Sequence, residues 1–168
     1  RIGKIARDLL DEKPVEALIE LHGSFARTYR GHGTDRAIIG GLLGFEPHDP
    51  RIRDSLSLSK EEGLNFIIEK VDLKNAHPNT TRIRVAGKSG RSIVMTAASI
   101  GGGNIVVKEL NGLEVNFTGR NHTMVIPHRD APGVVAAVTG LLSANGINIG
   151  EMRLFRKKRG GDAIMVME

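Results

Sequence analysis

The fold is decided by residues 80–117, which read TTRIRVAGKSGRSIVMTAASIGGGNIVVKELNGLEVNF. Apolar and polar residues alternate in this stretch with the period of two that is typical of β-strands. The pattern breaks at Gly87–Gly90, Ser99–Gly103 and Asn111–Gly112, and the Asn-Gly pair is a strong signal for a two-residue hairpin turn. We therefore predict four strands, over 81–86, 93–97, 104–110 and 113–117, joined as one antiparallel meander.

The residues before the meander supply two more strands and the helices that cover the sheet. Residues 15–21 alternate in the strand pattern, and 65–73 return to it. A short helical turn is predicted over 24–27, and a longer helix begins at Thr34 or Asp35 as its N-cap. Pro50 can open a further helix that ends at Gly63.

A second unit begins near Gly119 and has the order β-α-β-β. Strands are predicted over 123–127, 147–155 and 163–167, and an apolar stripe over 134–142 predicts a helix that ends at Asn145-Gly146. This order is the first part of the split βαβ ferredoxin-like motif, without its second helix and last strand. The fold class is therefore α+β, with one unit over 1–118 and another over 119–168.

The charge of the chain is concentrated in one place. The 168 residues carry 24 basic and 19 acidic side chains, a formal net charge of +5. Five of the basic residues lie between Arg153 and Arg159, and the remaining 19 balance the 19 acidic ones. Aromatic residues make up only 4% of the chain, so platforms for stacking bases are scarce. A solvated turn, or a patch facing an acidic partner subunit, accounts for this run better than binding to nucleic acid.

The chain contains no cysteine, which excludes disulfides, thiolate nucleophiles and any iron–sulfur cluster ligated by this chain through Cys. Its longest uncharged run, 131–150, holds Pro132, two asparagines and four glycines, and indicates a helix with flanking turns rather than a membrane span. The sequence begins at Arg1 and stops inside an apolar run, so we expect a piece of a larger protein.

The segment Gly31-His32-Gly33-Thr34-Asp35 is the first candidate for chemistry. Flanking glycines let the backbone approach a ligand closely, and the helix that follows offers free N–H groups to an anion. A histidine held there can take a proton near neutral pH. The alternative is a glycine-rich turn in which a surface histidine caps a helix.

Two further segments could bind a ligand. Ser99-Ile-Gly101-Gly102-Gly103 can form a nest of N–H groups for a carboxylate or phosphate, and a β-bulge or wide turn is the alternative. His77-Pro78-Asn79-Thr80 is, taken alone, a turn before a strand.

The turn Asp130-Ala131-Pro132-Gly133 lies between a predicted strand and the start of a helix. Its exposed N–H groups could receive the carboxylate of an amino acid, and the alternative is a purely structural βα turn.

Together these segments resemble a known family. Gly23-Ser24, the GHGTD segment, His77-Pro-Asn-Thr80 and Ser99-Ile-Gly-Gly-Gly103 follow one another as in the β subunit, or β domain, of iron–sulfur-dependent L-serine dehydratase. Residues 119–168 resemble an ACT domain that stops before its second helix. The resemblance covers nearly the whole chain.

This resemblance implies conversion of L-serine to pyruvate and ammonia by a cytoplasmic enzyme of amino-acid metabolism and gluconeogenesis. In the family a [4Fe-4S] cluster is held by cysteines of a partner α chain, which agrees with the absence of cysteine here. ACT units pair side by side, so a homodimer through residues 119–168 is expected. Neither nucleic acid nor a membrane is an expected partner.

The resemblance also assigns site residues. His32 is the expected base, and His77 matches a family histidine near the active-site cleft. The remaining expected substrate-binding residues are Ser24, Gly33, Thr34, Asp35, Asn79, Ser99, Gly101, Gly102 and Gly103. Asp130, Pro132 and Gly133 are the expected effector-binding residues of the ACT unit.

The sequence departs from the family pattern in two ways, and a rival reading exists. The family's Ser-Ser-Ser-His-Thr motif and the second half of the ACT unit are missing, so this stretch alone is expected to be inactive. The first unit also resembles the allosteric substrate-binding domain of some phosphoglycerate dehydrogenases, which would make the chain a regulatory module that senses an amino acid or anion. His32 favours the dehydratase, because a sensor needs no base.

Overall fold

The computed structural model describes residues 1–168 and contains two β-sheets with five helices. The helices are α1 (Ile2–Leu10), α2 (Gly23–His32), α3 (Thr34–Leu42), α4 (Ser55–Glu61) and α5 (Val134–Ala144), with a 3-10 turn η1 (Pro50–Asp54). The strands are β1 (Pro14–His22), β2 (Asn65–Val71), β3 (Thr80–Gly87), β4 (Ser92–Gly101), β5 (Asn104–Leu110), β6 (Leu113–Phe117), β7 (Met124–Arg129), β8 (Met152–Arg156) and β9 (Asp162–Met167). The predicted α+β class is confirmed.

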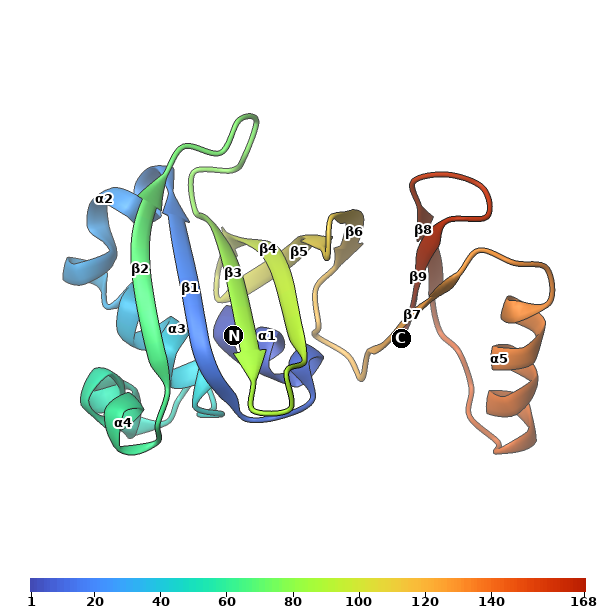
Figure 1. The fold of residues 1–168 in the computed structure, drawn as a ribbon, viewed down its shortest axis with the longest axis horizontal. Helices are drawn as coiled ribbons and strands as arrows, with labels where there is room; N and C mark the ends of the chain where they lie inside the picture. Colours follow the sequence, from blue (N-terminus) through green and yellow to red (C-terminus); the bar gives the residue numbers. More distant parts are fainter.

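The larger sheet has the strand order β2-β1-β3-β4-β5-β6 (Figure 1). Strands β3 to β6 form the predicted antiparallel meander, and β5 and β6 have the predicted bounds. The sheet is mixed rather than wholly antiparallel, because β1 and β2 pair in parallel. A parallel neighbour needs a long crossover, and α2, α3 and α4 provide it between these two strands.

Two helices differ from the sequence-based expectation. Helix α1 was not predicted, although Ile2, Ala6 and Leu10 are buried at a spacing of four residues and form its apolar stripe. Helix α2 runs to His32, well beyond the expected turn at 24–27. Gly31 and His32 are therefore helical, and within the predicted glycine loop only Gly33 has a positive φ, of 67°.

The main core lies between the helices and one face of the larger sheet. Helix α1 contacts α3, β3 and β4, and in Figure 1 the strands β1 and β3 are drawn in front of α1 and α3. The helices approach closely at two glycines: a Cβ on Gly41 would lie 2.5 Å from the backbone nitrogen of Lys4, and one on Gly3 would meet the carbonyl of Ile38. Small residues thus set the distance between α1 and α3.

The second sheet, of order β7-β9-β8, lies between α5 and the main unit. Side chains alternate along its central strand β9. Ile164 and Val166 join the main core, whereas Met165 and Met167 pack with Leu142 of α5. In Figure 1 this unit stands beside β6, which contacts both β8 and β9.

No helix is both long enough and apolar enough to cross a membrane.

The close approach at Gly41 gives a prediction about stability. Gly41→Ala should lower the free energy of unfolding by about 1–3 kcal/mol, because the new methyl group overpacks the contact with α1. The matched control is Gly140→Ala in α5, where a Cβ meets nothing within 4 Å. That change should raise the free energy by about 0.5–1 kcal/mol through helix propensity. Urea unfolding of both variants measures the difference, and equal effects would contradict the packing of α1 on α3.

Candidate functional site

Three of the sequence motifs are joined by backbone hydrogen bonds. The N–H of Ser24, at the start of α2, donates to the carbonyl of Pro78 at 2.7 Å, and the N–H of Phe25 donates to the same oxygen at 3.4 Å. The N–H of Ser99, near the end of β4, donates to the carbonyl of Asn79 at 2.9 Å. The loop before β3 is thereby held between a helix N-terminus and the last residues of a strand.

Gly23 is the residue that makes this arrangement possible. Its φ is 57°, and a Cβ there would lie 2.6 Å from the Pro78 carbonyl oxygen. Both the backbone conformation and the lack of space require glycine at this position.

A cavity of about 410 Å³ brings together predicted residues from two motifs. His32 and Thr34 reach it from the junction of α2 and α3, and Ser99 and Gly103 reach it from the end of β4 and the turn that follows. Its apolar wall comes from the helices, the loop after α3, η1 and the start of β5: Ile2, Phe25, Ala37, Ile38, Phe45, Pro47, Ile52 and Ile105. An apolar cavity with a few convergent polar groups is the usual form of a small-molecule site.

The α2–α3 junction places its polar groups differently from the sequence expectation. His32 is exposed at the last position of α2, and Thr34 is the first residue of α3. The N-cap of α3 is Gly33, so the prediction of Thr34 or Asp35 as N-cap is wrong. Asp35 is buried, and one of its carboxylate oxygens accepts a hydrogen bond from the N–H of Arg36 at 2.8 Å.

The glycine segment after Ser99 forms a turn with a bulge. Gly101, Gly102 and Gly103 have φ values of 91°, 58° and 73°, which side chains would strain. The pairing register between β4 and β5 shifts between Ser99 and Gly101. Gly103 lines the cavity of His32, whereas Gly101 and Gly102 are exposed outside it.

His77 is not brought to this cavity. Its Nδ1 accepts a hydrogen bond from the N–H of Asn79 at 3.1 Å, and the ring is exposed. It borders a different hollow of about 640 Å³, together with Thr80, Arg82 and Lys108 among others. His32 and His77 thus share a connection through the Pro78–Asn79 backbone but not a cavity.

In the second unit Asp130 is engaged in holding a turn. Its carboxylate accepts hydrogen bonds from Arg156 at 2.6 Å and from the N–H of Gly160 at 2.9 Å. Both hydrogen bonds lower the pKa of Asp130 below its usual range, and the one from the Gly160 N–H has the larger effect. Gly133, with a φ of 89°, caps α5, and Pro132 is exposed beside it. The basic run is thereby tied back to the strand that precedes α5.

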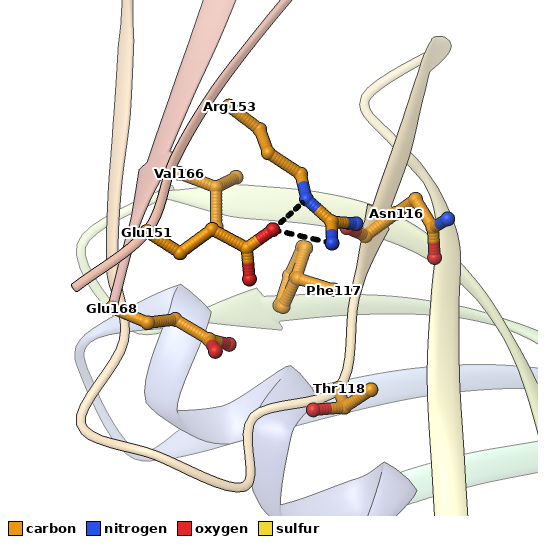
Figure 2. A pocket seen from close by; sticks show the side chains of 7 residues that line it. All are labelled: Asn116, Phe117, Thr118, Glu151, Arg153, Val166 and Glu168. Carbon is orange, nitrogen blue, oxygen red and sulfur yellow. Dashed lines mark hydrogen bonds and ion pairs between the residues drawn. The ribbon is translucent and has the colours of Figure 1, made fainter.

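A small cavity of about 60 Å³ at the junction of the two units was not foreseen (Figure 2). Arg153 donates to the carbonyl of Asn116 on β6 at 2.9 Å and also binds the carboxylate of Glu151. Sequence reasoning missed this role because Arg153 stands at the edge of a basic run, and nothing in its spacing indicates a partner far along the chain. None of the predicted site residues lines this cavity.

The residues of this chain do not fit an iron–sulfur cluster. The sequence has no cysteine, and no three of its His, Asp and Glu side chains are grouped as a metal site.

A matching family model and two similar relatives agree on one protein family. A family model described as serine dehydratase beta chain matches residues 3–110. The chain is 39% identical to the probable L-serine dehydratase beta chain of Bacillus subtilis, over 100% of this chain and 76% of that protein. It is 36% identical to the L-serine dehydratase beta chain of Peptoniphilus asaccharolyticus, over 94% of this chain and 72% of that one. A D-3-phosphoglycerate dehydrogenase of Bacillus subtilis is 27% identical over 99% of this chain but only 32% of its own length.

The backbone connection at Gly23 can be tested directly. Gly23→Ala should lower the free energy of unfolding by about 1–3 kcal/mol, because the methyl group strains φ and meets the Pro78 carbonyl. Hydrogen exchange of the Ser24 and Ser99 amides should become faster. Gly31→Ala is the control, since Gly31 is helical and has nothing within 4 Å of a Cβ. Unchanged exchange at both amides would contradict the proposed link between the motifs.

The engagement of Asp130 predicts a pH dependence. The pKa of Asp130 is lowered in the folded chain. The hydrogen bond from the Gly160 N–H to the ionised carboxylate is therefore fully present at pH values above the ordinary carboxyl pKa, and it is lost only as the pH falls through the lowered pKa. An NMR titration should therefore show the Gly160 amide shifting at a pH below that of an exposed carboxyl group. In Asp130→Asn the Gly160 transition should disappear. A Gly160 transition at the ordinary carboxyl pKa would show that the two groups are not coupled.

Proposed function

The chain belongs to the serine dehydratase beta chain family, and we propose that it forms, with a partner α chain, an enzyme that converts L-serine to pyruvate and ammonia. The observation that carries this proposal is the cavity shared by His32, Thr34, Ser99 and Gly103. All four residues lie in the part of the chain that the family model matches. The cavity has the size of a small-molecule site, and its polar groups converge from the α2–α3 junction, from the end of β4 and the turn that follows, and from Arg1.

His32 is the proposed base. It removes the α-proton of L-serine, the Cβ–O bond breaks, and the departing hydroxyl group takes a proton from the imidazolium of His32 and leaves as water. The resulting enamine takes up a proton at its β-carbon to give an imine, and water hydrolyses the imine to pyruvate and ammonia. The imidazole suits these steps because it is exposed at the cavity, where it can reach a bound substrate.

The other polar groups are proposed to hold the substrate. The hydroxyl groups of Thr34 and Ser99 and the backbone of Gly33 and Gly103 can hydrogen-bond the carboxylate and amino groups of L-serine. Ser24 and Asn79 contribute through the backbone connection that positions Ser99. Asp35, Gly101, Gly102 and His77 are proposed on the family resemblance alone.

The [4Fe-4S] cluster is assigned to the partner chain by the resemblance, since this chain offers no cysteine ligand. The name "beta chain" of the relatives supports the existence of a partner. A cytoplasmic location and a role in amino-acid breakdown and gluconeogenesis are proposed on the same basis.

Residues 119–168 are proposed to be an ACT unit, separate from residues 1–118. The start of a new sheet at β7 and the order β-α-β-β support this division. Exposed apolar side chains on this unit, among them Leu141 and Ile147, support pairing with a second ACT unit. We propose Asp130, Pro132 and Gly133 as its effector site, with Asp130 acting through the turn that it holds.

A second candidate function is regulatory. Similarity to the D-3-phosphoglycerate dehydrogenase extends over nearly the whole of this chain but over only a third of that protein. The chain would then sense a small molecule without turning it over. Binding of L-serine without pyruvate formation, in the presence of the partner chain and iron, would favour this reading.

The assembled enzyme tests the role of His32. In the full β chain reconstituted with its partner and iron, His32→Ala should lower kcat by about 10²- to 10⁴-fold, as expected for loss of a general base. The control is His122→Ala, an exposed histidine outside the cavity. Pyruvate formation gives the rate, and the iron and sulfide content of each preparation shows that assembly is intact. A near-normal kcat for His32→Ala would remove the assignment.

A further inference from the structure

The larger sheet has one face that no helix of this chain covers. Strands β2, β1, β3 and β4 turn alternate residues toward the helices, as Ala17, Ile19, Ile83 and Val85 in the core show. The residues between them point to the opposite side, and Ile67 there is 61% exposed. We call this side the open face; its residues are Glu16, Leu18, Glu20, Asn65, Ile67, Glu69, Arg82, Arg84, Ala86, Ser92, Val94 and Thr96.

Strand pairing arranges the open face in rows across β2, β1, β3 and β4. The central row is apolar except at one position, and it reads Ile67, Leu18, Arg84 and Val94. One neighbouring row reads Glu69, Glu20, Arg82 and Thr96, and the other reads Asn65, Glu16, Ala86 and Ser92. A shallow hollow of about 400 Å³ lies over β2, β1 and β3, with Leu18 and Ile67 in its lining.

Charge is divided between the two halves of the open face. The half formed by β2 and β1 carries Glu16, Glu20 and Glu69 and no basic residue, whereas β3 carries Arg82 and Arg84 and no acidic one. Glu20 and Arg82 form an ion pair. Glu16, Glu69 and Arg84 form no ion pair within the chain, and Glu69 stands beside Glu20, a like-charge neighbour that is unfavourable in isolation.

This division makes the open face complementary to itself. A two-fold axis along the strands, between β1 and β3, places β1 of one copy over β3 of the other and β2 over β4. In the central row, Ile67 then meets Val94 of the second copy, and Leu18 lies over Arg84 of the second copy. In the neighbouring rows, Glu20 faces Arg82 of the second copy, and Glu16 comes beside Arg84 of the second copy. Two sheets packed face to face with aligned strands are a common arrangement in proteins.

We propose that the open face binds a second copy of this chain about that axis. The apolar side chains of the central row, Ile67, Leu18 and Val94, are removed from water, and Glu16 and Arg84, which form no ion pair within the chain, gain partners of opposite charge. This interface is distinct from the one proposed for residues 119–168, because it uses only β1 to β4.

The oligomeric state of the full β chain, purified alone, tests the proposal. Sedimentation equilibrium of the Leu141→Glu variant over a range of concentrations should show a dimer, because this change removes Leu141, which is 66% exposed on α5, from the separate contact proposed for residues 119–168. Adding Ile67→Glu should raise the Kd of this dimer by about 100-fold or more, because the dimer contains the changed contact twice.

Exchanging the charges of Glu16 and Arg84 gives a second test, which compares two single variants with their combination. Arg84→Glu and Glu16→Arg should each weaken the dimer, and combining them in one chain should restore it, since each copy then offers the pair with its signs exchanged. Circular dichroism confirms folding, which these exposed positions should not disturb.

Three results would overturn the proposal. One is a chain that stays monomeric at every concentration. Another is a dimer lost with Leu141→Glu but kept with Ile67→Glu, which would place the contact on the second unit. The third is an Ile67→Glu variant that no longer binds the α chain, which would show that the α chain, and not a second copy of this chain, covers the open face.

Discussion

The carbonyls of Pro78 and Asn79 connect the start of α2 to the end of β4 through the loop before β3. One receives the N–H groups at the start of α2, and the other receives the N–H of Ser99. Because α2 ends at His32 and β4 leads into the glycine turn, these hydrogen bonds link the two elements that supply the polar groups of the cavity. Gly23 permits this contact through its positive φ and its lack of a Cβ.

Much of the fold could be predicted, because the β-pattern between 80 and 117 is regular and its turns carry glycine or Asn-Gly. Strand pairing between β1 and β2 could not, since the same alternation fits a parallel or an antiparallel neighbour. Helix α2 was predicted too short because Gly31 suggested a loop, whereas the helix continues through Gly31 to His32, and glycine's weak helix propensity does not end it there.

In the candidate site, too, the local motifs could be predicted from the sequence, whereas contacts between residues far apart in the sequence could not. Each motif was visible in the sequence, and His32, Thr34, Ser99 and Gly103 do meet. The separation of His77 from them could not be seen, because it depends on which side of the sheet the loop before β3 lies. Asp130 could not be assigned to the Gly160 turn either, because hydrogen bonds between distant residues leave no periodic signal.

The alternation along β9 has a practical consequence for dissecting this protein. Since Ile164 and Val166 belong to the core of the first unit, cutting the chain near Gly119 would leave apolar surface on both pieces. The two halves, produced separately, should therefore aggregate. If a protease cuts the linker of the intact chain, the two fragments should stay associated. The boundary that describes the architecture is not a boundary at which the polypeptide can be divided.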